Sequence, residues 1–381
     1  MDRIYLDHAA TTAARPEVVA AMVPLLGGGF NPSSLHAEGR AARAALDDAR
    51  ASVAQVLSAA PREIVFTGGG SEANVLAIVG AARAAVTRGR HVVTAVTEHH
   101  AVLHAFDVLE RDGWQVTRLP VGASGLVDSA AFAAALTPQT TLASMMLANN
   151  EIGVIQPIAR LAAIARECGV LFHTDAVQAA GWLPLDVEAL GVDLLSLSAH
   201  KFSGPKGVGA LYVRRGTPLE PLIVGGGQEH GLRAGTENVA GIVGLAVALR
   251  LAEAERADQA PRVAALRDRL EAAIAGIPGV AINGAGAPRL PATLSVAFAD
   301  VPSDALLIRL DLDGIAASAG SACAAGSLEP SHVAAALGLD GRYRLGVVRF
   351  SLGRETTGRE IDSVIARLPA LVAGVRTPAH V

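Results

Sequence analysis

One lysine stands directly behind an apolar stretch, in the segment Ser198-Ala199-His200-Lys201. A lysine at the end of a buried strand can form a Schiff base with an aldehyde cofactor if its surroundings keep part of the amine neutral. A lone loop lysine is more often only exposed to solvent. The chemical interpretation of Lys201 therefore depends on the residues that accompany it.

A carboxyl group follows the apolar stretch Val170–Phe172, in His173-Thr174-Asp175. Pyridoxal phosphate acts as an electron sink when a buried carboxylate keeps its ring nitrogen protonated, and Asp175 is placed for that role. Gln178, three residues later, can donate a hydrogen bond to the ring hydroxyl. Taken alone, Asp175 would more often be a helix cap.

A glycine-rich turn, Thr67-Gly68-Gly69-Gly70-Ser71, connects a predicted strand to a predicted helix. Backbone amides at a helix start, together with the hydroxyl of Ser71, can bind a phosphate group. The spacing differs from both the Walker loop and the GxGxxG dinucleotide pattern. Glycine and serine are also common in strand-to-helix turns that bind nothing.

Two histidines follow the apolar stretch Val92–Val96, in Thr97-Glu98-His99-His100. The imidazole of His99 can stack on a pyridine ring and move protons near neutral pH. The alternative is a histidine at a helix start that faces solvent. We expect that second role for His100.

The chain has two cysteines, too few for a disulfide framework or a zinc site, and no metal site is predicted. Cys323 stands among small residues in Ser321-Ala322-Cys323-Ala324, which is typical of a loop that can deliver a thiol. Cys168 lies between a predicted helix end and a buried strand. We expect Cys168 to be a packing residue.

Apolar strands alternate with alanine-rich helices between residues 61 and 213. This alternation predicts an α/β domain with a mainly parallel seven-stranded sheet, whose ligands bind beyond the carboxyl ends of the strands. The predicted strands are Ile64–Thr67, His91–Val96, Gln115–Leu119, Thr141–Leu147, Leu171–Thr174, Leu194–Ser198 and Gly209–Val213.

The pattern changes after about Arg250 and indicates a smaller α+β domain. We expect a large domain over residues 15–255 and a small domain over 1–14 and 256–381, with the Cys323 loop at about 318–330. The elements predicted for the small domain are two helical stretches, Ala252–Arg256 onward and Arg262–Ile274, strands around Thr293–Phe298 and Val347–Leu352, and a final helix from about Gly358 to Val375.

Composition excludes several classes of function. A length of 381 residues is enough for two domains, and a net charge of -4 gives no basic surface for nucleic acid. The first residues carry charges where a signal peptide would be apolar. The apolar stretch Val239–Leu249 is too short to span a bilayer. We expect a cytoplasmic protein that binds neither membranes nor nucleic acid directly.

The glycine turn, His99, Asp175 and Lys201 occur in this order, each at a predicted strand end. Together they resemble the cysteine desulfurases of the NifS/IscS type, within class V of the fold-type I enzymes that depend on pyridoxal phosphate. The resemblance extends almost end to end. The segments that carry it are YLDHAATT, NPSSLH, EIVFTGGGSEAN, TEHHAV, ANNEIGVIQP, HTDAVQ, SAHKFSGPKGVGALYV, GGGQEHGLRAGTEN, SAGSACAAGSLEPSHV and VRFSLGR.

The resemblance implies a bound pyridoxal 5'-phosphate. It implies that Lys201 is the Schiff-base lysine, that Asp175 pairs with the ring nitrogen, and that His99 stacks on the ring and shuttles protons. The other cofactor contacts that it implies are Gly70, Ser71, Asn150, Gln178, Ser198, His200 and Thr236, the last toward the phosphate of a neighbouring subunit.

The resemblance also assigns the substrate side of the site. Arg349 matches an arginine that grips the substrate carboxylate, and a guanidinium group suits a carboxylate in bidentate geometry. An unpaired cation on an apolar strand would be costly, so a structural salt bridge is the alternative. Of the two arginines nearby, Arg354 is expected to be the structural one. Asn150 and Asn31 are expected to line the substrate end.

The implied activity is conversion of L-cysteine to L-alanine, with a persulfide formed on Cys323. The sulfur would pass to an acceptor or scaffold protein for iron–sulfur clusters, thio-cofactors or thiolated tRNA. A homodimer with shared active sites is also implied. The alternatives are a selenocysteine lyase, an aminotransferase, a kynureninase-like hydrolase or a non-catalytic scaffold. Cys323 argues against the aminotransferase and the hydrolase, which need no thiol there.

Overall fold

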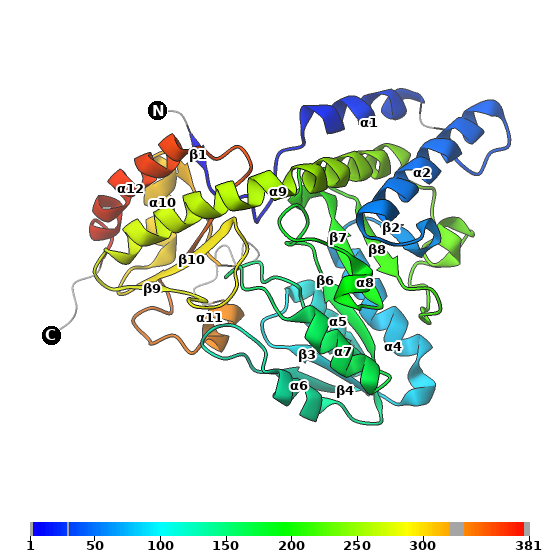
Figure 1. Ribbon diagram of the computed structural model, residues 1–381, viewed down its shortest axis with the longest axis horizontal. Coiled ribbons are helices and arrows are strands. Elements are labelled where there is room, and N and C mark those ends of the chain that lie inside the picture. Colours follow the sequence, from blue (N-terminus) through cyan, green and yellow to red (C-terminus); the bar gives the residue numbers. More distant parts are fainter. Residues whose placement is uncertain (1–2, 29, 321–330, 377–381) are drawn as a thin grey trace.

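The computed structural model describes residues 3–28, 30–320 and 331–376. A seven-stranded sheet, in the order β2-β8-β7-β6-β5-β3-β4, forms the centre of the larger lobe (Figure 1). The predicted α/β class is confirmed, and the predicted strands agree with the observed ones to within three residues. The observed strands are β2 Ile64–Thr67, β3 His91–Ala95, β4 Gln115–Leu119, β5 Thr140–Ser144, β6 Leu171–Asp175, β7 Leu194–Ser198 and β8 Gly209–Val213.

Most neighbouring strands of this sheet are parallel. Strands β4, β3, β5, β6 and β7 pair in parallel, whereas β8 pairs antiparallel with β7 and β2. The carboxyl ends of the parallel strands therefore lie at one edge of the sheet. This edge carries Asp175 and Ser198, the last residues of β6 and β7, and the segment after β3 that contains His99.

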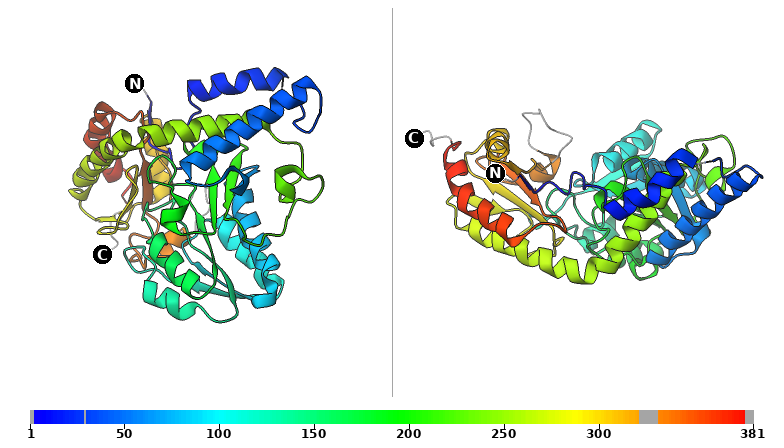
Figure 2. Two further views of the ribbon diagram at one scale, coloured as in Figure 1. Left: turned by 45° about the vertical axis from the view of Figure 1, so that its right-hand side comes forward. Right: turned by 90° about the horizontal axis from the view of Figure 1, so that it is seen from above.

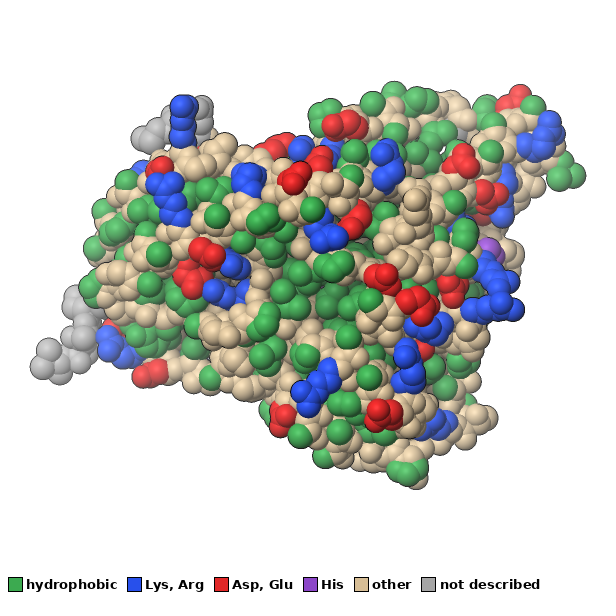
Figure 3. Space-filling view, viewed as in Figure 1, with side chains coloured by type: hydrophobic (Ala, Val, Ile, Leu, Met, Phe, Trp, Pro, Cys, Tyr) green, Lys and Arg blue, Asp and Glu red, His purple; other side chains and the backbone are tan. Residues whose placement is uncertain are grey.

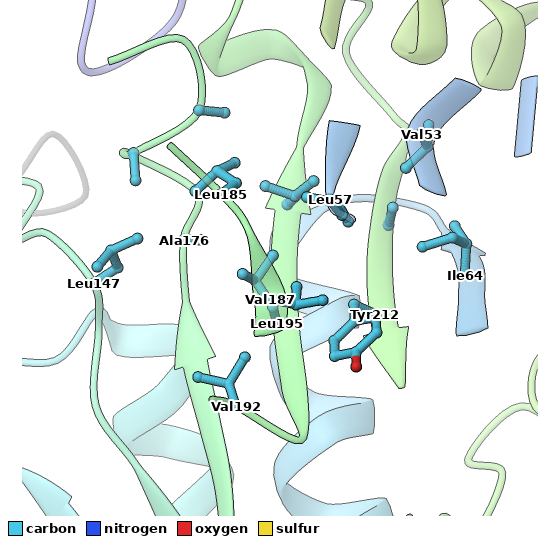
Figure 4. Close-up of a cluster of buried hydrophobic side chains, with 14 of the residues drawn as sticks. Val53, Leu57, Ile64, Leu147, Ala176, Leu185, Val187, Val192, Leu195 and Tyr212 are labelled. Atoms are coloured by element: carbon cyan, nitrogen blue, oxygen red, sulfur yellow. The ribbon is translucent and has the colours of Figure 1, made fainter. Parts of the chain in front are cut away.

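Helices cover both faces of the sheet, which explains why its central strands are apolar without alternation. One face packs against α1, α2, α6 to α8 and the first half of α9. Figure 4 shows Val53, Leu57, Leu195 and Tyr212 as members of the buried cluster in this layer. The other face packs against α3 to α5. The helices of this lobe are α1 Pro16–Gly28, α2 Ala37–Val56, α3 Gly70–Val75, α4 Ala81–Ala84, α5 His100–Arg111, α6 Ser129–Ala135, α7 Ile158–Glu167 and α8 Val187–Leu190. Short helical turns are η1 Pro61–Glu63, η2 Leu76–Gly80, η3 Val86–Arg88, η4 Ala199–Lys201 and η5 Gln228–Gly231.

The smaller lobe is built on a three-stranded antiparallel sheet with β10 between β9 and β12. The N-terminal strand β1 joins this lobe through parallel pairing with β11, and Leu6 is fully buried in its core. The elements of this lobe are β1 Ile4–Tyr5, β9 Val280–Ile282, β10 Thr293–Phe298, α10 Ser303–Leu312, β11 Ile315–Ala316, α11 His332–Ala336, β12 Val347–Ser351 and α12 Gly358–Ala373.

One long helix, α9 (Val239–Ala275), joins the two lobes (Figure 2). The prediction of two separate helical stretches here was wrong, because Pro261 lies inside a single continuous helix. Proline removes one backbone hydrogen bond and usually bends or ends a helix. Apolar burial of both halves offsets that cost, with Leu245 in the larger core and Leu270 in the smaller one. The predicted domain boundary at residues 255 and 256 falls within α9 and stays a prediction.

The surface shows no large area of one charge on the face seen in Figure 3, where acidic and basic side chains are intermingled. Within the described ranges, no helix has both the length and the apolar character needed to cross a membrane. The apolar stretch Val239–Leu249 is the first part of α9, and most of its side chains are buried in the larger core.

Candidate active site

A cavity of about 700 Å³ lies at the carboxyl edge of the sheet. Its walls come from the ends of β2, β3, β6 and β7, from the segment after β1, and from β12. Ten of the residues predicted for the site line it together: Gly70, Ser71, His99, Asn150, Asp175, Gln178, Ser198, His200, Lys201 and Arg349.

Three predicted site residues are not placed in this cavity. Asn31 and Thr236 are exposed and do not line it within a single chain. The side-chain oxygen of Asn31 instead accepts a hydrogen bond from the backbone N–H of Ser33, at 2.9 Å. Thr236 was expected to act in a neighbouring subunit, and that role stays a prediction. Cys323 lies outside the described residues.

Lys201 ends the short helix η4, which follows β7. Its amine donates hydrogen bonds to the backbone carbonyls of Ala9, at 2.6 Å, and Ala10, at 2.8 Å. Gln178 donates to the same Ala9 carbonyl at 3.0 Å. The segment after β1 thus forms a wall of the cavity beside Lys201. No residue type in the sequence indicated this wall, because it acts through backbone atoms.

Asp175 is the last residue of β6 and is buried. One oxygen of its carboxyl group accepts from Val177 N at 2.9 Å, which is the local contact that a capping aspartate makes. The other oxygen accepts from the side chain of Asn74 at 2.7 Å, across 101 residues of sequence. Both oxygens are therefore fixed. Asn74 was missed as a site residue, although a polar amide soon after the glycine turn was a usable signal.

His99 is the N-cap of α5, and its Nδ1 accepts a hydrogen bond from Ala101 N at 3.1 Å. The neutral ring then carries its proton on Nε2. Burial lowers the pKa of His99, Asp175 opposes that shift, and Lys201 adds to it. His99 is accordingly neutral at pH 7 and can accept a proton.

The prediction that His100 faces solvent was wrong. His100 is half-buried, and its ring centroid lies 5.3 Å from that of His104 and 4.7 Å from that of His332. His332 begins α11 and donates from Nε2 to the backbone carbonyl of Glu98, at 2.9 Å. A segment more than 200 residues away in sequence therefore covers His100, and no local pattern reveals that contact.

The glycine turn lies directly against the ends of β6 and β7. A Cβ atom added to Gly70 would lie 2.8 Å from Val177 Cγ2 and 3.1 Å from Ser198 Cβ, so only glycine permits this approach. His200 contacts the hydroxyl of Thr11 at 3.1 Å. Burial, first among the causes, lowers the pKa of His200 to about 4, so its ring is neutral at pH 7.

Arg349 is buried in β12 and lies 2.8 Å from a carboxyl oxygen of Asp7. Its Nη1 donates to the carbonyls of Asn150, at 2.8 Å, and Gly320, at 3.3 Å. The structural salt bridge that was the alternative for Arg349 is therefore present. Arg354, expected to be the structural one of the two, pairs only with the adjacent Glu355 among the described residues. Arg349 Nε is buried and has no hydrogen-bond partner among the described residues.

The prediction of a packing role for Cys168 was wrong, because its side chain is exposed. Cys168 is the C-cap of α7, as the sequence indicated, but the end of this helix lies at the protein surface. The buried strand β6 begins only three residues later. The sequence next to a buried strand does not reveal whether a side chain at the preceding helix end faces the core or the solvent.

His173 lies in β6, two residues before Asp175, and is fully buried between the hydroxyls of Ser144, at 2.7 Å, and Ser196, at 3.0 Å. Burial lowers its pKa from 6.5 to about 3. The unfolded chain then binds a proton below pH 6.5 that the folded chain does not, so stability falls as the pH decreases.

Because only the unfolded chain protonates His173 in this range, we expect the free energy of unfolding to fall by about 2 kcal/mol between pH 7.5 and pH 5.0. His173→Gln keeps a hydrogen-bonding side chain that does not titrate, so its pH dependence should be weaker by that amount. Urea unfolding of both proteins at the two pH values measures the difference, and other titrating groups cancel in the comparison. An equal pH dependence in the two proteins would contradict the expectation.

Comparison with known proteins gives similarities over nearly the whole chain. Residues 4–364 match the model of the aminotransferase class-V family. The chain is 47% identical over 376 residues to a cysteine desulfurase IscS of Dictyoglomus turgidum, covering 98% of this chain and 95% of that protein. A solved NifS-like protein is 36% identical with a TM-score of 0.92, covering 98% of this chain and 100% of that chain. The structure of SspA in complex with cysteine is 38% identical with a TM-score of 0.81, covering 93% and 100%.

Proposed function

Because this chain belongs to the aminotransferase class-V family and, within it, to the cysteine desulfurases, we propose that it converts L-cysteine to L-alanine and transfers the sulfur. The observation that carries the proposal is the convergence of Lys201, Asp175 and His99 on one cavity that Arg349 also lines. These residues come from three strand ends and from the second lobe. One bound amino acid could therefore be near the amine of Lys201, the carboxyl group of Asp175, the imidazole of His99 and the guanidinium group of Arg349.

The proposed cofactor is pyridoxal phosphate, and the residues of the cavity fit it. Asp175 offers a buried carboxyl group whose orientation Asn74 fixes, as a ring nitrogen needs. Gly70 packs closely on Ser198 and is the first residue of α3. The backbone N–H groups at the start of this helix suit a phosphate. When bound, the cofactor supplies an electron sink for negative charge on the amino acid. Lys201 would hold it, and the proposed further contacts are Ser71, Asn150, Gln178, Ser198, His200 and, from a second subunit, Thr236.

Arg349 and His99 are proposed to act on the substrate itself. The unpartnered Nε of Arg349 is a buried donor that a substrate carboxylate would satisfy, while Asp7 accepts from Nη2 of the same guanidinium group. His99, neutral at pH 7, would accept and return a proton, as would the amine of Lys201. Asn150 lies beside Arg349 through its backbone carbonyl.

Cys323 is proposed to be the sulfur acceptor. Its thiolate bonds to the substrate sulfur, the substrate carbon–sulfur bond breaks with its electron pair on carbon, and a proton completes the methyl group of alanine. L-cysteine and the thiol thus yield L-alanine and a persulfide, with no further oxidant. Support comes from the described residues that flank residues 321–330, because Gly320 and Ser331 are both hydrogen-bonded at the cavity wall.

The proposed partners are a second copy of the chain and a sulfur acceptor or iron–sulfur scaffold protein, in the cytoplasm. Val19, Val23 and Leu26 form an exposed apolar stripe on α1, at the spacing of one helix face. Ile223 and Val224 are also exposed. Such apolar surface favours burial in a dimer.

The test is the product balance of the purified protein with L-cysteine and a thiol reductant. We expect alanine and sulfide in equal amounts, at a rate that depends on added pyridoxal phosphate in protein stripped of cofactor. Alanine is measured by chromatography and sulfide by colorimetry. Cofactor uptake without any cysteine-dependent alanine would leave the family assignment intact and refute the proposed substrate.

A further inference from the structure

Glu151 is a buried carboxyl group at the cavity, and the proposed reaction assigns it no role. Its side chain lines the cavity and is 2% exposed. Burial raises its pKa, while Ser331 and Arg349 oppose that shift. A buried acid is costly unless its oxygens have partners, so its contacts indicate what it is for.

The first contact is with Ser331, the first described residue after position 330. Its hydroxyl donates to Glu151 Oε2 at 2.5 Å, across 180 residues of sequence. The same hydroxyl accepts from Val333 N at 3.1 Å and so caps α11. Glu151 therefore fixes the start of α11 to the cavity wall.

The second contact is with Gly320, the last described residue before position 321. A Cβ atom added to Gly320 would lie 2.2 Å from Glu151 Oε2, which means that the backbone passes directly against the carboxyl group. The Gly320 carbonyl also accepts from Arg349, at 3.3 Å. One carboxyl oxygen thus contacts both of the described residues that flank positions 321–330.

Glu151 is itself held firmly. The side-chain oxygen of Asn149 accepts from the backbone N–H groups of Glu151, at 2.9 Å, and Ile152, at 3.0 Å. The side chain of Asn149 donates to the carbonyl of Thr97, two residues before His99, at 2.8 Å. Through Asn149, Glu151 therefore connects Gly320 and Ser331 to the wall that carries His99.

We propose that Glu151 is a positioning residue for sulfur transfer, which holds Gly320 and Ser331, the described residues that flank Cys323 in sequence, together beside Arg349 at the cavity wall. The inference rests on the proposed function. Misplacement of reacting groups by about 1 Å can cost on the order of 10²-fold in rate. Loss of Glu151 should therefore slow sulfur transfer and leave cofactor and substrate binding intact.

The test compares Glu151→Ala, Glu151→Gln, Gly320→Ala and the double variant Glu151→Ala/Gly320→Ala. The readout is the rate at which persulfide appears on Cys323, from alkylation and mass spectrometry after one exposure to L-cysteine. Retained cofactor absorption, and its change on adding L-cysteine, show that each variant still folds and binds substrate. Ser331→Ala removes the same hydrogen bond from the other side and serves if Glu151→Ala does not fold.

We expect Glu151→Ala and Gly320→Ala each to slow persulfide formation by about 10- to 100-fold. Glu151→Gln keeps a hydrogen-bond acceptor of the same size and should stay within a few-fold of wild type. In the double variant the added methyl group enters the space that Glu151 vacates, so the two losses should not multiply. Wild-type rates in both Glu151→Ala and Ser331→Ala, or fully multiplicative losses, would overturn the inference. Absence of persulfide in the wild-type protein would instead refute the proposed function.

Discussion

Replacing Lys201 with alanine should lower the rate of alanine formation from L-cysteine by about 10³-fold or more. The chain contains two lysines, Lys201 and Lys206, among many arginines. An arginine stays protonated at every accessible pH and cannot bond to an aldehyde or exchange protons. Lys201 also lies at the cavity wall, where its amine is 2.6 Å from the Ala9 carbonyl. Its loss should therefore remove both the proposed anchor of the cofactor and a proposed proton carrier.

Lys206→Ala is the matched control, because Lys206 follows in the same loop and lines the same cavity but is exposed. It removes the same charge and should stay within a few-fold of wild type. Borohydride reduction of the holoenzyme, followed by peptide mass spectrometry, should place the cofactor on Lys201 in wild type and in Lys206→Ala. Labelling of Lys206, or substantial alanine formation by Lys201→Ala, would contradict the assignment.

Replacing Cys323 with serine should abolish persulfide formation and lower alanine release by about 10³-fold or more. A serine hydroxyl is not ionised near neutral pH and does not attack sulfur as a thiolate does. Cofactor absorption and its change on adding L-cysteine should remain, because the proposed contacts Lys201, Asp175 and Arg349 are unchanged. Single-turnover assays separate these steps.

Cys168→Ser provides the control, because Cys168 is the other cysteine of the chain and is exposed. An exposed thiol is alkylated by the same reagents, so total labelling cannot identify the sulfur carrier. We expect Cys168→Ser to form persulfide at the wild-type rate and to lose little stability. Persulfide on Cys168 in the Cys323→Ser protein would overturn the role of Cys323.

The lengths of the strands and their positions along the chain were predictable from the sequence. Apolar runs such as Leu194–Ser198 are local patterns, and parallel pairing brings their carboxyl ends to one edge. For that reason the residues after these runs, among them His99, Asp175 and Lys201, could be expected to share a site on the pattern of the chain alone. Resemblance to a family then assigned their roles.

Local rules failed where tertiary burial decided the outcome. Two helical stretches were expected on either side of Pro261, yet α9 continues through this residue because its two halves are buried in different cores. Cys168 was expected inside and His100 outside. Both expectations depended on which side of a helix end would be covered, and distant segments determine that.

The sequence alone determined which residue types stand at the strand ends, because strand patterning involves neighbours within a few positions. Only the tertiary structure decided what holds those residues in place. Arg349 is paired with Asp7 across 342 residues, Asp175 is oriented by Asn74 across 101, and Glu151 contacts Ser331 across 180. Such partners are set by how distant segments pack, within one lobe for the first two pairs and between the lobes for the third. A local sequence pattern does not contain that information.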